Sequence, residues 1–242
     1  MDYEKILINE IKAWKNDMEK GPKFTSIISK KVQNKVNEII PKEAHEIITA
    51  ALKNMTKVLL KGSEIISGKP YHSLTMRERD YLFEEKKESY RKAATISGIS
   101  IGAGGIMIGL ADLPVLLSIK IKFLYDTALI YGYDIRDFKE RLFILYVFML
   151  AFSCDEKRLE IYQIVKRFDK IKDKLPSSYE EFDWKSFQQE YRDYIDLAKL
   201  LQFLPIVGAV FGGVANYRLL NRLSYISKNA YRYRTLKSKG LL

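Results

Sequence analysis

Side chains that most often do chemistry are scarce in this chain of 242 residues, which contains two histidines and one cysteine. Ser100 lies in a Gly-x-Ser-x-Gly pattern that runs from Gly98 to Gly102 and matches a nucleophile elbow. That elbow requires a strand before the serine and a histidine after it. A charged helical pattern precedes Ser100, and both histidines, His45 and His72, come earlier in the chain. We interpret the match as a coincidence within a glycine-rich run.

The sequence motifs for metal binding and nucleotide binding are also incomplete. His45-Glu46 continues as Ile47-Ile48-Thr49, so the second histidine of a zinc-binding H-E-x-x-H helix is missing. No glycine-rich loop ends in Gly-Lys-Ser/Thr, and none follows a predicted strand. We therefore expect no catalytic residues, no metal and no cofactor, and we predict that the protein is not an enzyme. The alternative is an enzyme with a non-standard carboxylate site that acts on lipid or peptide.

The C-terminal part of the chain, from about residue 217 to 242, is basic and rich in tyrosine. Residues 197–242 contain eight Lys or Arg and no Asp or Glu, in a chain whose net charge is +11. Tyrosine rings and long basic side chains suit a membrane interface, where each cation near an anionic leaflet contributes about 1 kcal/mol. We expect an anionic membrane surface as the partner. The predicted lipid or anion contacts are Arg218, Arg222, Lys228, Arg232 and Arg234.

Reversing these five charges is expected to abolish lipid binding while leaving the fold intact. A solvated helix face is the simpler alternative for such a run of charges. Nucleic acid would also be attracted, by phosphate contacts and by stacking on tyrosine. Because no helix-turn-helix, finger or RNA-binding signature is present, we expect no nucleic-acid partner.

The elements that would position these residues are helices. Apolar residues recur with helical spacing, and neither clean period-2 strands nor Asn-Gly or Asp-Gly hairpins are found. Local signals include capping boxes at Thr75/Glu78 and Ser153/Glu156, a cap at Asp134 and a helix end at Gly132. No linker divides the chain, so we expect one all-α domain, a compact multi-helix bundle over residues 1–242. The expected helices cover about 2–20, 25–40, 42–61, 75 onward, 111–131, 134 onward with an apolar run over 142–154, 153–174, 183–204 and 206 onward.

Two glycine-rich segments carry no charge, residues 93–111 and 200–217. If they are helical, small residues form one stripe on each, which lets two backbones approach closely. We expect the two segments to pack together, in a tight helix crossing or as a hairpin that enters the bilayer. Asp112 borders the first segment as a cap or as a buried partner for a cation. The stripes contain Gly98, Gly102, Gly105 and Gly109 in the first segment and Gly208 and Gly212 in the second.

The N-terminus opens into a mixed-charge amphipathic pattern instead of a signal peptide, and the lone Cys154 gives no internal disulfide. The predicted location is therefore cytoplasmic, peripheral at the inner face of the cell membrane.

An ordered set of segments resembles the EcsC family and covers most of the chain. The segments are Gly102–Lys120, Ile130–Asp134, Lys139–Leu142, Ala151–Arg158, Leu204–Ala209 with Asn216, and Tyr231–Arg234.

This resemblance implies a helical protein associated with an Ecs-type ABC transporter, whose other members are an ATPase and a membrane subunit. The activity of the family is not established, so the resemblance assigns no catalytic residue. The expected function is that of a peripheral membrane accessory or regulatory protein of the transporter. The alternative outside enzymology is a protein-interaction module whose basic surface docks an acidic protein.

Overall fold

The computed structural model describes residues 3–20, 42–62, 68–101, 113–153, 155–183, 187 and 209–242. These ranges contain helices and no β-strand, which confirms the all-α prediction. The elements are α1 (Tyr3–Glu19), α3 (Lys42–Lys61), α4 (Met76–Ile101), α6 (Leu113–Ile130), α7 (Phe138–Phe152), α8 (Asp155–Ile171), the 3-10 turn η1 (Lys172–Lys174) and α11 (Ala209–Ser238).

Two predicted helix boundaries are set by the local interactions that the sequence indicates. The Thr75 backbone N–H donates to Glu78 Oε2 at 2.7 Å, and the Glu78 N–H donates to Thr75 Oγ1 at 3.3 Å, which forms the expected capping box. Gly132 follows α6 at φ +90°, and the next N–H, that of Tyr133, donates to the carbonyl of Ala128 at 2.9 Å. Because a left-handed backbone favours glycine, Gly132 ends this helix as predicted.

The predicted cap at Asp134 is wrong. Asp137 caps α7, since its Oδ1 accepts from the Lys139 N–H at 2.9 Å. Asp134 lies one turn earlier and accepts from the backbone N–H of Arg136 at 3.0 Å. An Asp can stabilise a local turn as well as a helix start, and two Asp residues three apart compete for the same role. The predicted helix over 25–40, most of the one over 183–204, and the side chain of Glu156 lie outside the described residues.

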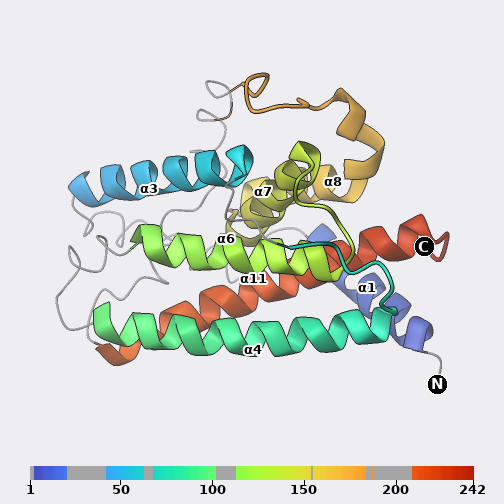
Figure 1. Ribbon diagram of the computed structural model, residues 1–242, viewed down its shortest axis with the longest axis horizontal. Coiled ribbons are helices and arrows are strands. Elements are labelled where there is room, and N and C mark those ends of the chain that lie inside the picture. Colours follow the sequence, from blue (N-terminus) through green and yellow to red (C-terminus); the bar gives the residue numbers. More distant parts are fainter. Residues whose placement is uncertain are drawn as a thin grey trace.

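Helices α4 and α11 run side by side in opposite directions (Figure 1). Their side-chain contacts fix the register: Arg91 stacks over Tyr217, Glu84 binds Lys228, and Asp80 binds Arg232. The C-terminal end of α4 therefore lies beside the N-terminal end of α11. Helix α6 packs on α4 and α3 packs on α6, while α7 contacts α11 and is covered by α8.

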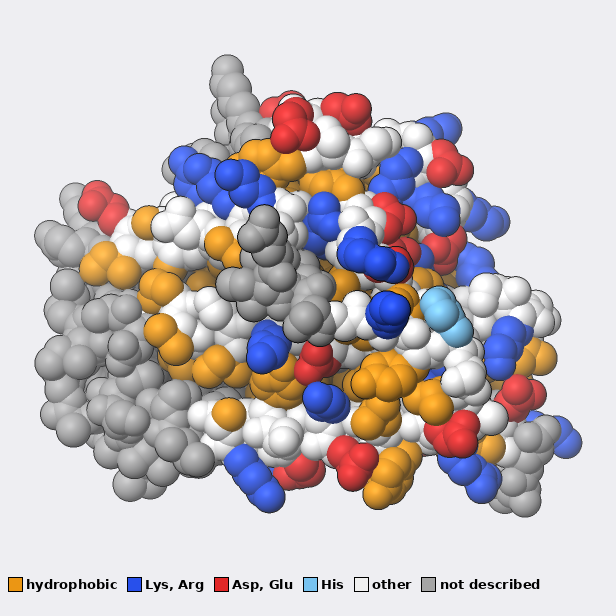
Figure 2. Space-filling view, in the orientation of Figure 1, with side chains coloured by type: hydrophobic (Ala, Val, Ile, Leu, Met, Phe, Trp, Pro, Cys, Tyr) orange, Lys and Arg blue, Asp and Glu red, His pale blue; other side chains and the backbone are white. Residues whose placement is uncertain are grey.

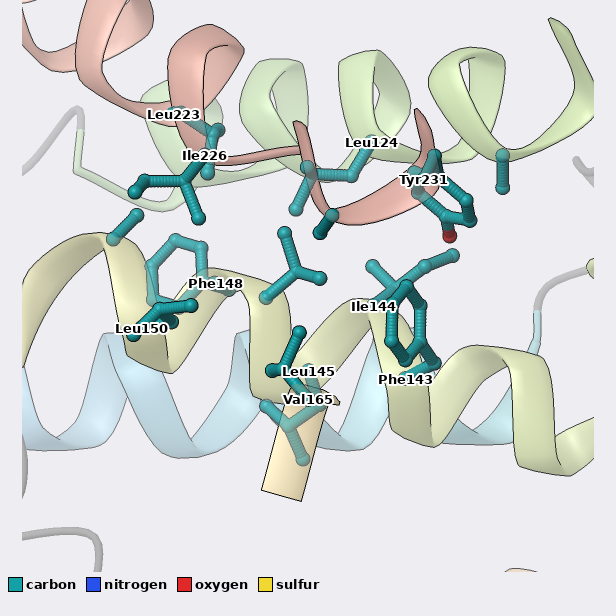
Figure 3. Close-up of a cluster of buried hydrophobic side chains, with 14 of the residues drawn as sticks. Leu124, Phe143, Ile144, Leu145, Phe148, Leu150, Val165, Leu223, Ile226 and Tyr231 are labelled. Atoms are coloured by element: carbon teal, nitrogen blue, oxygen red, sulfur yellow. The ribbon is translucent and has the colours of Figure 1, made fainter. Parts of the chain in front are cut away.

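The apolar core gathers around α7, as Figure 3 shows. Phe148 and Ile144 of α7 lie toward α6 and α11, whereas Val165 of α8 lies on the opposite side of α7. The short apolar run of this helix is buried, as its length and composition suggest. Other core residues drawn there are Leu124, Phe143, Leu145, Leu150, Leu223, Ile226 and Tyr231. In the described ranges, no helix is both long enough and apolar enough to cross a bilayer.

A lysine is buried in this bundle. Lys120 of α6 is fully enclosed, and its Nζ donates to the carbonyl of Leu116 at 3.3 Å. Burial disfavours the charged form and lowers the pKa of Lys120 to about 7. In an unfolded chain the pKa of lysine is about 10.4. The unfolded chain thus binds more protons between these two values, so stability rises with pH across this window.

We expect the free energy of unfolding to rise by about 2 kcal/mol between about pH 7 and pH 9 through Lys120 alone. Lys120→Met keeps about the same side-chain length and removes the titratable amine. The unfolding free energy of the variant should therefore not show this rise with pH. Urea unfolding of both proteins at the two pH values measures the difference. If the difference in unfolding free energy between the two proteins does not change with pH, the lowered pKa of Lys120 is contradicted.

Candidate functional site

The basic C-terminal segment is a core helix. Residues 229–236 of α11 are all buried, because α11 lies against α4 and α7 and also touches α1, α6 and α8. This helix contains most of the basic segment predicted over about 217–242, and its exposed residues include Tyr217, Arg218 and Tyr225 as well as Ser238 at its C-terminal end. Its buried cations need partners inside the protein.

Arg232 is paired with a carboxylate at the centre of a hydrogen-bond network. Its Nε and Nη2 donate to the two oxygens of Asp80, each at 2.8 Å, and its Nη1 donates to Glu10 at 2.6 Å. The hydroxyls of Tyr3 and Tyr131 also donate to Asp80, each at 2.5 Å. Burial alone would lower the pKa of Arg232, but its bonds with Asp80 outweigh burial and raise the pKa. The network joins α1, α4 and α11 to Tyr131, the residue that follows α6.

Arg234 forms a second network on the other side of α11. Its Nη1 and Nη2 donate to Glu140 at 2.7 and 2.8 Å, and its Nη2 and Nε donate to Asp169 at 2.6 and 3.1 Å. The guanidinium carbon also lies 4.2 Å from the ring centre of Tyr133 and 4.1 Å from that of Phe143. Burial would lower the pKa of Arg234, but the bonds with Glu140 and Asp169 raise it. This network joins α7, α8 and α11.

Two of the five predicted lipid contacts therefore have structural partners. Arg232 and Arg234 are 5% and 2% exposed, which does not fit direct contact with lipid. Reversing their charges would place additional negative charge beside Asp80 and Glu140 in the core. The expectation that all five charges can be reversed without damage to the fold therefore does not fit the buried ion pairs of these two residues.

The other three predicted contacts lie nearer the N-terminal end of α11. Arg218 is exposed, Arg222 is partly buried and donates to the carbonyl of Ala151, and Lys228 binds Glu84 at 2.7 Å. Their contact with lipid stays a prediction. Among these three, Arg218 presents the most open side chain.

A charged cleft of about 600 Å³ lies between α1, α4 and α11. Helical spacing explains its walls: α4 contributes residues at intervals of three and four, and α11 does the same along four turns. Arg232 is one of its lining residues, so the cleft borders the Asp80 network. It is lined by Glu10, Ala13, Phe83, Glu84, Lys87, Arg91, Tyr217, Asn221, Ser224, Tyr225, Lys228, Asn229 and Arg232.

Glu84 is the central carboxylate of this cleft. Its oxygens accept from Lys87 and Lys228, each at 2.7 Å. Partial burial would raise the pKa of Glu84, but the two lysines outweigh burial and lower it. A general acid at neutral pH needs the opposite shift. Glu84 is thus better suited to bind the two lysines as a carboxylate than to donate a proton.

The glycine stripes lie mostly outside the described residues. Gly102, Gly105, Gly109, Gly208 and Asp112 belong to that undescribed part, so their packing roles stay predictions. Gly98 lies in the last turns of α4, and Gly212 lies in the first turn of α11.

Ser100 also lies in the last turn of α4, and the residues before it are helical. The strand that a nucleophile elbow requires is absent there, which supports reading the motif as a coincidence. The described residues contain no group of three or more His, Cys, Asp or Glu placed to hold a metal ion.

Sequence reasoning missed the partners of the buried arginines. Asp80, Glu140 and Asp169 lie in charged stretches of α4, α7 and α8 that resemble solvated helix faces. Asp80 lies four residues before Glu84, so the same face of α4 carries both the buried network and the cleft.

Together the fold and the cleft define an all-helical bundle protein with a cationic helix at its centre. The chain belongs to the EcsC protein family, whose model matches residues 5–236. It is 41% identical to Protein EcsC of Bacillus subtilis (strain 168) over 238 residues, which cover 98% of each chain. It is also 31% identical over 157 residues to uncharacterized protein YdbA of the same strain, covering 65% of this chain and 58% of that protein. No solved structure matches the chain.

Proposed function

We propose that this protein is a non-enzymatic, peripheral membrane protein that assists or regulates an Ecs-type ABC transporter at the inner face of the cell membrane. Membership of the EcsC family supports the link to the Ecs system. The lowered pKa of Glu84 supports a binding role for the cleft over acid–base chemistry.

The antiparallel pairing of α4 and α11 is the observation that carries the membrane part of the proposal. The charge-free segment 93–111 begins directly after Lys92 of α4, and the charge-free segment 200–217 ends directly before Arg218 of α11. Both segments therefore meet the described bundle at one end of the helix pair (Figure 1). The charge-free ends of α4 and α11, residues 93–101 and 209–217, favour this end of the helix pair as the side that faces a bilayer.

The side chains at this end have the composition of a membrane interface. Lys92 and Arg218 are exposed, and Arg91 stacks over the half-exposed ring of Tyr217 at 4.2 Å. Long basic side chains reach head groups, and tyrosine rings suit the same depth. On the face seen in Figure 2, Lys and Arg are mixed with Asp, Glu and hydrophobic side chains, and one group of Lys or Arg lies side by side. The interfacial composition thus favours the end of the bundle over that face.

We expect the double variant Lys92→Glu/Arg218→Glu to bind anionic vesicles at least about thirtyfold more weakly than the unaltered protein. Each cation near an anionic leaflet contributes about 1 kcal/mol, so losing two corresponds to about 2 kcal/mol before any repulsion is added. Flotation with vesicles that contain phosphatidylglycerol measures the binding.

The matched control is Lys53→Glu/Lys170→Glu, which makes the same change of net charge at exposed positions on α3 and α8. Equal losses for both double variants would mean that only the total charge matters. That result would contradict binding through this end of the bundle.

A further inference from the structure

Cations and some of their carboxylate partners line the cleft between α1, α4 and α11. Among the residues that line it, four are cations, Lys87, Arg91, Lys228 and Arg232, and two are acids, Glu10 and Glu84. Its volume of about 600 Å³ is within the range of small-molecule sites. Several lysine and arginine donors in one cleft suit a small anion with several acceptor oxygens.

We propose that this cleft binds a phosphate ester group at the cations around Glu84. Lys87 and Lys228 share this one carboxylate, which leaves one positive charge uncompensated. The Glu84 side chain is 45% exposed, so it can move toward solvent when a ligand enters. A phosphate carries more charge and more acceptor oxygens than a carboxylate, and can therefore bridge both lysines.

Arg91 also lines the cleft, one turn beyond Lys87 toward the C-terminal end of α4. Its guanidinium is held by an ion pair with Glu88 and by stacking on Tyr217. A guanidinium fixed in this way is well suited to bind phosphate oxygens in pairs. The half-exposed ring of Tyr225 also lines the cleft and offers an apolar surface to the carbon skeleton of the ester.

The phosphate ester can come from a free metabolite or from a lipid head group, and both present the same chemistry. The lipid source rests on the proposed function. It is favoured by the direction of the cleft, which runs from Arg232 to Arg91 and Tyr217, and so toward the end where the charge-free segments join the bundle. A head group bound by Lys87 and Lys228 could leave its acyl chains on that side.

Isothermal titration calorimetry with glycerol 3-phosphate measures binding to the cleft, and two variants should change the affinity in opposite directions. Lys228→Gln removes a charge-assisted donor and should weaken binding about tenfold. Glu84→Gln removes the competing carboxylate and should strengthen binding. Lys170→Gln, at an exposed position on α8, should leave binding unchanged. Glu84→Gln binding more weakly than the unaltered protein would overturn the proposal, because the ligand would then depend on negative charge.

Flotation with vesicles of phosphatidylcholine, with and without phosphatidic acid, identifies the source. Flotation that Lys228→Gln weakens and Glu84→Gln strengthens assigns the phosphate to a lipid. Binding of glycerol 3-phosphate without flotation supports the cleft and contradicts the membrane proposal. Flotation that neither variant changes, without calorimetric binding, overturns the cleft and leaves the membrane proposal standing. No binding in either experiment overturns both.

Discussion

Replacing Arg234 with methionine is expected to lower the free energy of unfolding by about 3–5 kcal/mol. The substitution removes the cation that binds Glu140 and Asp169 and leaves the Glu140 carboxylate, which is nearly enclosed, without that partner. It also removes a guanidinium that contacts the rings of Tyr133 and Phe143. The desolvated carboxylate is the larger part of the effect, since a buried charge without its partner is strongly unfavourable.

Urea unfolding followed by circular dichroism measures this loss, with Arg167→Met on the exposed face of α8 as the control for an Arg-to-Met change. A double variant, Arg234→Met/Glu140→Leu, separates charge from packing. Because an apolar pair can replace a buried ion pair with little loss, the double variant should recover most of the stability. Stability of Arg234→Met within 1 kcal/mol of the unaltered protein would contradict a structural role.

Asp80→Asn should have an effect of similar size, about 3–5 kcal/mol, for the opposite reason. Here the anion is removed and Arg232 keeps only Glu10, whose side chain is half exposed. The amide also presents an N–H₂ group where the carboxylate accepted bonds from Tyr3, Tyr131 and Arg232. At least one donor must then face another donor.

The local stability of α1 should decrease most, because Asp80 and Arg232 join α1 to the rest of the bundle through Tyr3 and Glu10. Hydrogen exchange of Asp80→Asn should show faster exchange in α1 than in α7, which lies in the core. The control is Glu10→Gln, which changes one exposed ion pair and should cost less than about 1 kcal/mol. Uniform protection in α1 and α7 of Asp80→Asn would mean that Asp80 does not hold α1 in place.

Much of the fold could be predicted because its signals are local. The capping box at Thr75 and Glu78 involves residues three apart, and the turn at Gly132 depends on one backbone angle. Such features are encoded within a few residues. The displaced cap at α7 shows the limit of this reasoning, since Asp134 and Asp137 both suit a helix start.

The role of the basic segment could not be predicted from its charge count. Arg232 binds Asp80, which is 152 residues away in the sequence, and Arg234 binds Glu140, which is 94 residues away. No local pattern contains these pairs. The spacing of the two arginines was nevertheless informative, because side chains two residues apart on a helix point about 200° apart. Arg232 and Arg234 could not both face one flat membrane surface.

The positive charge of α11 is therefore divided between two roles along its length. Toward the C-terminus, Arg232 and Arg234 fix the bundle through buried carboxylates. Toward the N-terminus, Arg218 is exposed beside the α4 end that carries Lys92. We infer that the first pair is needed for stability, and we propose that the second pair is needed for binding to a membrane.

The most direct test of membrane binding is flotation of the purified, detergent-free protein with vesicles. The vesicles are prepared with and without anionic lipid, and flotation is measured at low and high salt. We expect the protein to float with anionic vesicles at low salt and to bind more weakly as salt rises, because exposed cations are screened. Absence of flotation under every condition would contradict membrane binding and direct the search to a protein partner.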